Sequence, residues 1–156
     1  MDLLGWDWEY EPFDLDGYIP DFQLTGFDGT PILEVKPAVR VSELEESVPK
    51  IKASGWAGDW LIVGATQWTV SPPKWGKSPG IGSFGEVWSQ AVFAYCRRCE
   101  AFSIAFLVLG TTWGCSRCRS QGEFSPGDLL DEDDWAWRTY WKDAGNEVQW
   151  RKAKKC

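Results

Sequence analysis

The chain has 156 residues, of which 44% are hydrophobic, and such a chain can bury a core in one or two small domains. It contains no histidine, which excludes Ser-His-Asp and Cys-His catalysis, histidine-based metal nucleases and Cys₂His₂ zinc fingers. Its net charge of −7 argues against general electrostatic attraction to nucleic acid. No stretch approaches the ~18 apolar residues of a membrane span, and the acidic start is unlike a signal peptide, so we expect a cytoplasmic protein without membrane association.

The first predicted elements are three strands. Trp6, Trp8 and Tyr10 alternate with acidic residues, which predicts a half-buried strand with an acidic outer face. Residues 18–24 and 32–36 then form a predicted antiparallel hairpin, because the segment between them carries the turn dipeptide Asp28-Gly29.

Three charged residues interrupt the apolar runs of this hairpin. Because side chains alternate between the faces of a strand, Glu34 and Lys36 share one face, and antiparallel pairing brings Asp21 beside them. Two carboxylates and the backbone carbonyl of Val35 are suitable ligands for Mg²⁺ or Mn²⁺. Lys36 would orient or activate the attacking water and stabilise charge on a phosphate, and Gln23, on the face of Asp21, would assist by hydrogen bonding. The alternative is an exposed hairpin with solvated charges, in which Lys36 merely pairs with Glu34.

Two short helices and a further strand are predicted next. The sequence Ser42-Glu43-Leu44-Glu45 favours a helix start, and Pro49 suits the first turn of a second helix that ends near Gly55. The apolar residues 61–64 predict a strand beside that of Glu34. Residues 71–85 are rich in Pro, Gly and Ser and predict an irregular loop, whereas residues 86–94 predict a helix.

Pro20-Asp21 followed by Glu34-Val35-Lys36 resembles the signature of the PD-(D/E)XK nucleases, the restriction-endonuclease-like superfamily. Residues 4–12 and 17–22 are similar to one phage and bacterial branch in particular, and the likeness covers roughly the first 65 residues. The resemblance implies an α/β (α+β) restriction-endonuclease-like core with a short mixed sheet, in a bacterium or a phage-infected host. It also implies hydrolysis of nucleic-acid phosphodiesters, with DNA favoured over RNA.

Relatives of this kind usually open with a helix that carries a further metal-binding glutamate. Residues 1–6 stand about where that helix would end, and Glu9 and Glu11 cannot be assumed to replace it. Either two carboxylates suffice, or a protein partner completes the site, or activity is impaired. The alternative function is therefore a non-catalytic nucleic-acid- or protein-binding module on a degenerate nuclease fold, such as a phage inhibitor or a DNA mimic.

Four of the five cysteines are spaced as zinc ligands. Cys96 and Cys99 form one C-x-x-C pair, Cys115 and Cys118 form another, and fifteen residues separate the pairs. Residues 102–109 predict a strand between them, as in a zinc ribbon, and disulfides are the weaker alternative in a reducing cytosol. Four thiolates leave no open coordination position, so the zinc ion would be structural.

Basic residues gather within this predicted ribbon. Arg97, Arg98, Arg117 and Arg119 lie in or directly after the two C-x-x-C pairs, and we expect them to contact the nucleic-acid backbone. The alternative is that these arginines only offset the negative charge of a zinc–cysteine centre.

The predicted organisation has three parts. A nuclease-like core without the usual N-terminal helix covers residues 1–92, and a Cys₄ zinc ribbon covers residues 93–122. Residues 123–156 form an acidic linker and a C-terminal helix, because the acids at 131–134 favour a helix start. The predicted protein is a Mg²⁺- or Mn²⁺-dependent endonuclease or exonuclease with structural Zn²⁺.

Overall fold

The structure, a computed structural model, describes residues 5–38, 40–69, 77–84, 87–108, 112–121 and 124. Eight strands in this part of the chain form one mixed sheet whose strand order follows the sequence. The strands are β1 (Asp7–Tyr10), β2 (Phe22–Thr25), β3 (Ile32–Val35), β4 (Trp60–Thr69), β5 (Lys77–Phe84), β6 (Val87–Cys96), β7 (Ala101–Val108) and β8 (Thr112–Cys115). Two helices, α1 (Val41–Glu45) and α2 (Val48–Ala53), join β3 to β4. The fold class is thus α+β as predicted, but the sheet is larger than the short sheet expected.

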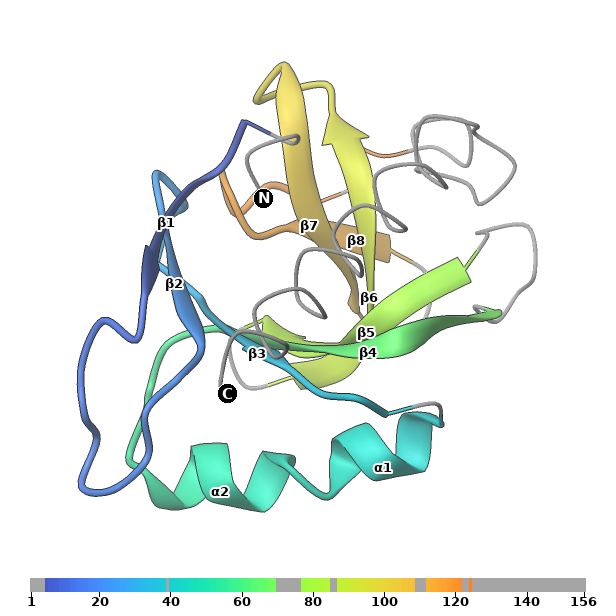
Figure 1. Cartoon of the computed structure of the whole chain (residues 1–156). Helices are drawn as coiled ribbons and strands as arrows, with labels where there is room; N and C mark the ends of the chain where they lie inside the picture. Colours follow the sequence, from blue (N-terminus) through green and yellow to red (C-terminus); the bar gives the residue numbers. More distant parts are fainter. Residues whose placement is uncertain are drawn as a thin grey trace, which may run out of the picture.

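The pairing of β3 with β4 is the one parallel pairing among these strands, and the other neighbours are antiparallel. A parallel pair needs a crossover, because the chain must return to the same end of the sheet before the second strand starts. Both helices lie within this crossover and cover one side of β3, β4 and β5 (Figure 1). In Figure 1, β3 and β4 run across the view whereas β6 and β7 run up it, so the sheet turns strongly along its length.

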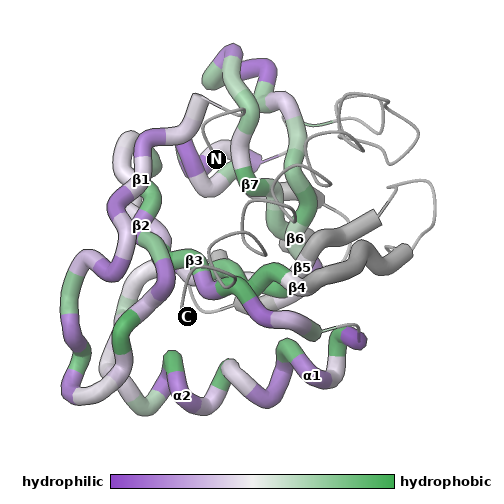
Figure 2. The backbone as a smooth tube through the Cα atoms, in the orientation of Figure 1, coloured by the Kyte–Doolittle hydropathy of each residue, from purple (hydrophilic) through white to green (hydrophobic). Residues whose placement is uncertain are grey.

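Both helices begin close to their predicted positions. The backbone N–H of Arg40 donates to the Glu43 carboxylate at 3.2 Å, so the capping residue of α1 lies two positions before the predicted Ser42. Pro49 lies in the first turn of α2, which ends shortly before Gly55 as predicted. In Figure 2 hydrophobic and hydrophilic residues alternate along both helices, as expected for elements that bury one face.

Two apolar clusters cover the two faces of the central strands. The cluster on the helix side consists of Ile32, Ala38, Leu44, Val48, Ile51, Trp60, Ile62 and Ile81. The cluster on the opposite side consists of Trp6, Leu24, Phe27, Leu33, Leu61, Val63, Ala91, Phe93, Ile104 and Phe106. Successive residues of β4 alternate between the two clusters, which explains why residues 60–63 are an uninterrupted apolar run beside the strand of Glu34.

The helix predicted over residues 86–94 is wrong, because residues 87–96 form β6. Ala91 and Phe93 face the cluster opposite the helices, whereas Val92 and Ala94 pack near the cysteines. A strand buried on both faces is a continuous apolar run, and sequence periodicity cannot distinguish such a run from a buried helix.

The loop predicted over residues 71–85 is wrong for residues 77–84, which form β5. The glycines that suggested a loop have a packing role instead. A Cβ atom at Gly80 would lie 2.0 Å from the carbonyl oxygen of Ile62, and one at Gly82 would lie 2.3 Å from the Phe106 ring. Glycine at these positions allows β5 to approach β4 and the opposite cluster closely.

The remaining expectations concern β1, the boundary between the predicted parts, the C-terminal helix and membrane association. β1 forms as predicted, but all its residues are exposed, with Tyr10 at 56%, so it is not the half-buried strand expected. β6 crosses the boundary expected between residues 92 and 93, and the division into separate folding units stays a prediction. The predicted C-terminal helix lies outside the described residues. Within the described part of the chain, no helix is long and apolar enough to cross a bilayer.

Candidate functional site

The carboxylate of Glu34 lies on the helix side of β3 and is only 7% exposed. Its neighbour across the parallel β3–β4 pair is Ile62, so its immediate surroundings are largely apolar. A carboxylate in such a place requires hydrogen-bond or charge partners, because desolvation otherwise costs several kcal/mol. Lys36 forms an ion pair with Oε1, and the Tyr18 hydroxyl donates to Oε2 at 3.2 Å.

Asp21 lies directly before β2 and is joined to the strand that carries Glu34. The backbone N–H of Val35 donates to Oδ2 of Asp21 at 2.7 Å. Burial raises the pKa of Asp21 above its usual range; the hydrogen bond from Val35 opposes this shift, the charge of Glu34 adds to it, and Lys36 opposes it. The structure therefore brings Asp21, Glu34 and Lys36 into one electrostatically coupled group.

Gln23 is the remaining residue predicted for this site. It pairs with Ile32 across the antiparallel β2–β3 ladder, and directly paired residues point to the same face. Gln23 therefore shares the helix side with Glu34, as expected from the alternation of the two strands. Its participation in chemistry stays a prediction.

The donor set of this group fits a hard divalent cation. Carboxylate and carbonyl oxygens are the ligands that Mg²⁺ and Mn²⁺ prefer, and Asp21, Glu34 and the Val35 carbonyl would supply them. Each carboxylate offers about four lone-pair sites. The contacts described above use two sites on Glu34 and one on Asp21, so both groups retain acceptor capacity.

Tyr18 belongs to this group, and sequence reasoning assigned it no role. Burial raises the pKa of its hydroxyl, and the negative charge of Glu34 and the hydrogen bond to Glu34 raise it further. The phenol is therefore protonated at neutral pH and donates to Glu34. One feature of the sequence could have pointed to Tyr18: it lies within residues 17–22, one of the stretches that carry the family resemblance.

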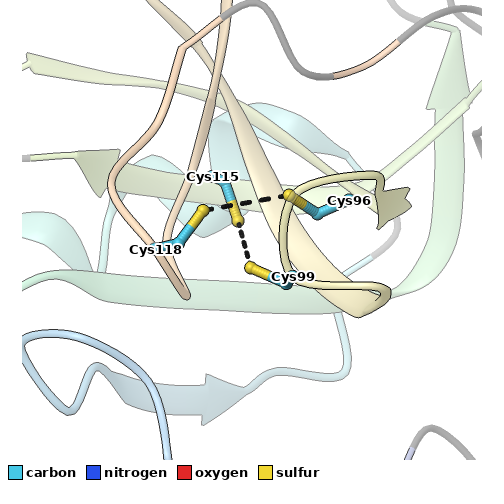
Figure 3. A group of neighbouring side chains, drawn as sticks. All are labelled: Cys96, Cys99, Cys115 and Cys118. Carbon is cyan, nitrogen blue, oxygen red and sulfur yellow. Dashed lines mark hydrogen bonds between the residues drawn. The ribbon is translucent and has the colours of Figure 1, made fainter.

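The second group consists of the four cysteines, which come from two turns (Figure 3). Cys96 and Cys115 end β6 and β8, and each following turn carries the second cysteine of its pair. All four sulfur atoms lie within 4.8 Å of one another, with Cys96–Cys118 at 3.9 Å and Cys99–Cys115 at 3.8 Å. A tetrahedral zinc ion with Zn–S bonds of about 2.3 Å sets sulfur atoms about 3.8 Å apart. The cluster can thus hold a structural Zn²⁺.

Hydrogen-bond partners surround the sulfur atoms. Burial raises the pKa of Cys115 to about 11, although the hydrogen bond between Cys115 and Ser103 and hydrogen bonds from the backbone of the same turn oppose the shift. Partial burial also acts to raise the pKa of Cys118, but hydrogen bonds with Ser120, Cys99 and Cys115 together outweigh it and lower the value to about 7. Thiolates this close repel one another, and a bound divalent cation removes that repulsion.

The second cysteine turn is attached to the hairpin that carries the acidic group. The carbonyl of Arg117 accepts from the N–H of Asp28 at 3.1 Å, and its guanidinium lies 5.1 Å from the centre of the Phe27 ring. Arg119 forms an ion pair with Asp59, which is 2% exposed and directly precedes β4. These contacts join the cysteine turn to both the β2–β3 loop and the start of β4.

The four arginines therefore differ in their surroundings. Arg97 and Arg98 are exposed on the first cysteine turn, and Arg117 and Arg119, in or after the second turn, make the contacts described above. Sequence reasoning missed the Arg119–Asp59 pair, because the two residues lie 60 positions apart. Contact of any of the four with nucleic acid stays a prediction.

Comparison of this chain with protein-family models, with curated proteins and with solved structures found no match. The structure itself establishes a cluster of four cysteines on a mostly-β mixed sheet, which is not specific to one family.

We predict that the purified protein holds one zinc ion per chain through the cysteine cluster. Cys99→Ser should lower zinc retention against a chelator, because it removes one of four sulfur ligands, whereas Cys156→Ser should leave retention unchanged. Native mass spectrometry measures both. Zinc-free wild-type protein, or equal retention by Cys99→Ser and wild type, would contradict the assignment.

Arg119→Ala should destabilise the zinc-loaded protein by about 1.5–3 kcal/mol, because it removes a charged partner from a buried carboxylate. The matched control is Arg98→Ala, on the exposed first turn, which should change the free energy of unfolding by at most about 0.5 kcal/mol. Urea denaturation measures both values. Equal stability of the two variants would rule out a structural role for the Arg119–Asp59 pair.

Proposed function

We propose that this protein is a metal-dependent nuclease that hydrolyses phosphodiester bonds of nucleic acid, and of DNA in particular. The observation that carries the proposal is the convergence of Asp21, Glu34 and Lys36 on one hairpin. Two carboxylates at a partly buried site can hold a divalent ion for phosphodiester hydrolysis, and a nearby ammonium group can stabilise the negative charge that develops on the phosphate.

The order of the elements supports a restriction-endonuclease-like core. β1, β2 and β3 are antiparallel neighbours, two helices follow, and β4 returns parallel to β3. The Pro20-Asp21 dipeptide directly precedes β2, and the Glu34-Val35-Lys36 signature lies at the end of β3. The residues that resemble the PD-(D/E)XK signature thus lie on adjacent strands at the same end of the sheet.

Each residue has a role that follows from its contacts. Asp21 and Glu34, with the Val35 carbonyl, would hold Mg²⁺ or Mn²⁺, and the ion when bound would stabilise negative charge on the phosphate. Lys36 can donate further hydrogen bonds, because an ammonium group has three N–H donors and the contact with Glu34 uses one of them. These donors are suited to orient a water molecule or to bind a phosphate oxygen.

Charge around the site bears on how a nucleic acid would approach. Residues 1–35 contain nine acidic residues and no lysine or arginine, so the hairpin itself repels phosphate. Attraction would come from the bound cation, from Lys36 and from the exposed arginines Arg97 and Arg98.

The second candidate is a non-catalytic binding module on a degenerate nuclease fold, such as an inhibitor or a DNA mimic. The exposed acids of β1, Asp7 and Glu9, favour it, because a row of carboxylates attracts basic partners rather than nucleic acid. Only a cleavage assay separates the two functions.

The test is cleavage of duplex, branched and single-stranded DNA and of RNA with Mg²⁺ or Mn²⁺. Asp21→Asn and Lys36→Ala should each lower the rate by about 100-fold or more, because Asp21 would hold the divalent ion and Lys36 would act on the attacking water or the phosphate. The matched controls are Asp28→Asn and Lys52→Ala, which alter exposed residues outside the site and should cut as wild type does.

Two precautions make this result decisive. The divalent ion is omitted rather than chelated in the blank, because a chelator would also strip the cysteine cluster. Thermal unfolding of each variant separates loss of chemistry from loss of fold, since Lys36→Ala removes a partner of the buried Glu34. If wild type cuts none of the substrates, or if the site variants cut as fast as the controls, the nuclease proposal is wrong.

A further inference from the structure

We propose that Tyr18 is a positioning residue that holds the Glu34 carboxylate in its metal-binding orientation. This inference rests on the proposed function, because it concerns the same site. The two oxygens of Glu34 have different partners: the flexible Lys36 on Oε1, and the Tyr18 hydroxyl on Oε2.

Tyr18 is well placed to act as a fixed donor. Its backbone exchanges two hydrogen bonds with Leu15, at 2.8 and 3.3 Å, and the N–H of Gly17 donates to the Asp14 carboxylate at 2.7 Å. Its ring packs against the cluster on the helix side of the sheet. The position of the hydroxyl is therefore set by a local turn and by packing, not by Glu34 alone.

Lys36 is a less constant partner for Glu34. Its side chain, directly after β3, is partly exposed and has a flexible stem of four carbons. In the proposed reaction the Lys36 ammonium divides its three donors between Glu34 and the water or the phosphate. Tyr18 has no such second partner in the proposed reaction, so its hydroxyl serves only to keep the carboxylate of Glu34 in place beside Asp21.

This arrangement has a measurable consequence for metal affinity. Groups that hydrogen-bond a metal ligand orient it, and their removal typically lowers metal affinity by roughly 10–100-fold. Tyr18→Phe removes only the hydroxyl and retains the ring that packs in the core. We therefore expect Tyr18→Phe to bind Mn²⁺ about 10-fold more weakly than wild type.

The experiment measures free Mn²⁺ by electron paramagnetic resonance during titration of zinc-loaded protein. The variants are Tyr18→Phe, Asp21→Asn and the matched control Tyr95→Phe. Tyr95 is 39% exposed, and its ring meets Phe102 edge to face far along the sheet. Tyr95→Phe should bind Mn²⁺ as wild type does, and Asp21→Asn should lose most of the affinity. Cleavage by Tyr18→Phe should require about 10-fold more Mn²⁺ for half of its maximal rate.

The outcomes separate this inference from the proposed function. If Tyr18→Phe binds Mn²⁺ as tightly as wild type while Asp21→Asn does not, the positioning role is wrong and the metal site stands. A Tyr18→Phe variant that loses thermal stability but keeps its Mn²⁺ affinity would show a merely structural role and would also overturn the inference. If Asp21→Asn binds Mn²⁺ as wild type does, the proposed metal site itself is wrong.

Discussion

The burial of the Glu34 carboxylate is the constraint on which the arrangement of the hairpin depends. β3 lies between two apolar clusters, and a charge on its helix side is tolerated only with partners. Lys36 is the partner of one carboxylate oxygen and Tyr18 of the other. Asp21 is held beside this carboxylate by a hydrogen bond from the N–H of Val35. The partners of this buried charge, together with the hydrogen bond from Val35 to Asp21, thus bring together the residues that would form a site for a divalent cation.

The described chain carries two sets of donor atoms with different chemistry. Oxygen donors at the hairpin suit a hard ion, whereas the four sulfur atoms suit zinc, so ligand type alone would sort the ions between the sites. Contacts of Arg117 with the β2–β3 loop and of Arg119 with Asp59 connect the cysteine turn to the strands of the acidic site. A closed zinc centre would then act by holding the hairpin, without any part in the chemistry.

Sequence analysis was most successful where the determining contacts are local. The hairpin, the two short helices, the strand at residues 61–64 and the two C-x-x-C turns each follow from spacing or alternation within one short segment. It failed at β5 and β6, because Gly80 and Gly82 serve close packing against distant strands and β6 is buried on both faces. The Tyr18–Glu34 bond and the Arg119–Asp59 pair are side-chain contacts between separate segments, which local patterns do not encode.

The most direct test of this account is to locate both ions by anomalous X-ray scattering from crystals of zinc-containing protein grown with Mn²⁺. Data collected on either side of each absorption edge distinguish manganese from zinc at each position. The account predicts a manganese peak between the carboxylates of Asp21 and Glu34, and a zinc peak among the sulfur atoms of the four cysteines. Manganese absent from the Asp21–Glu34 site at saturating Mn²⁺, with zinc present in the cysteine cluster, would contradict the central claim.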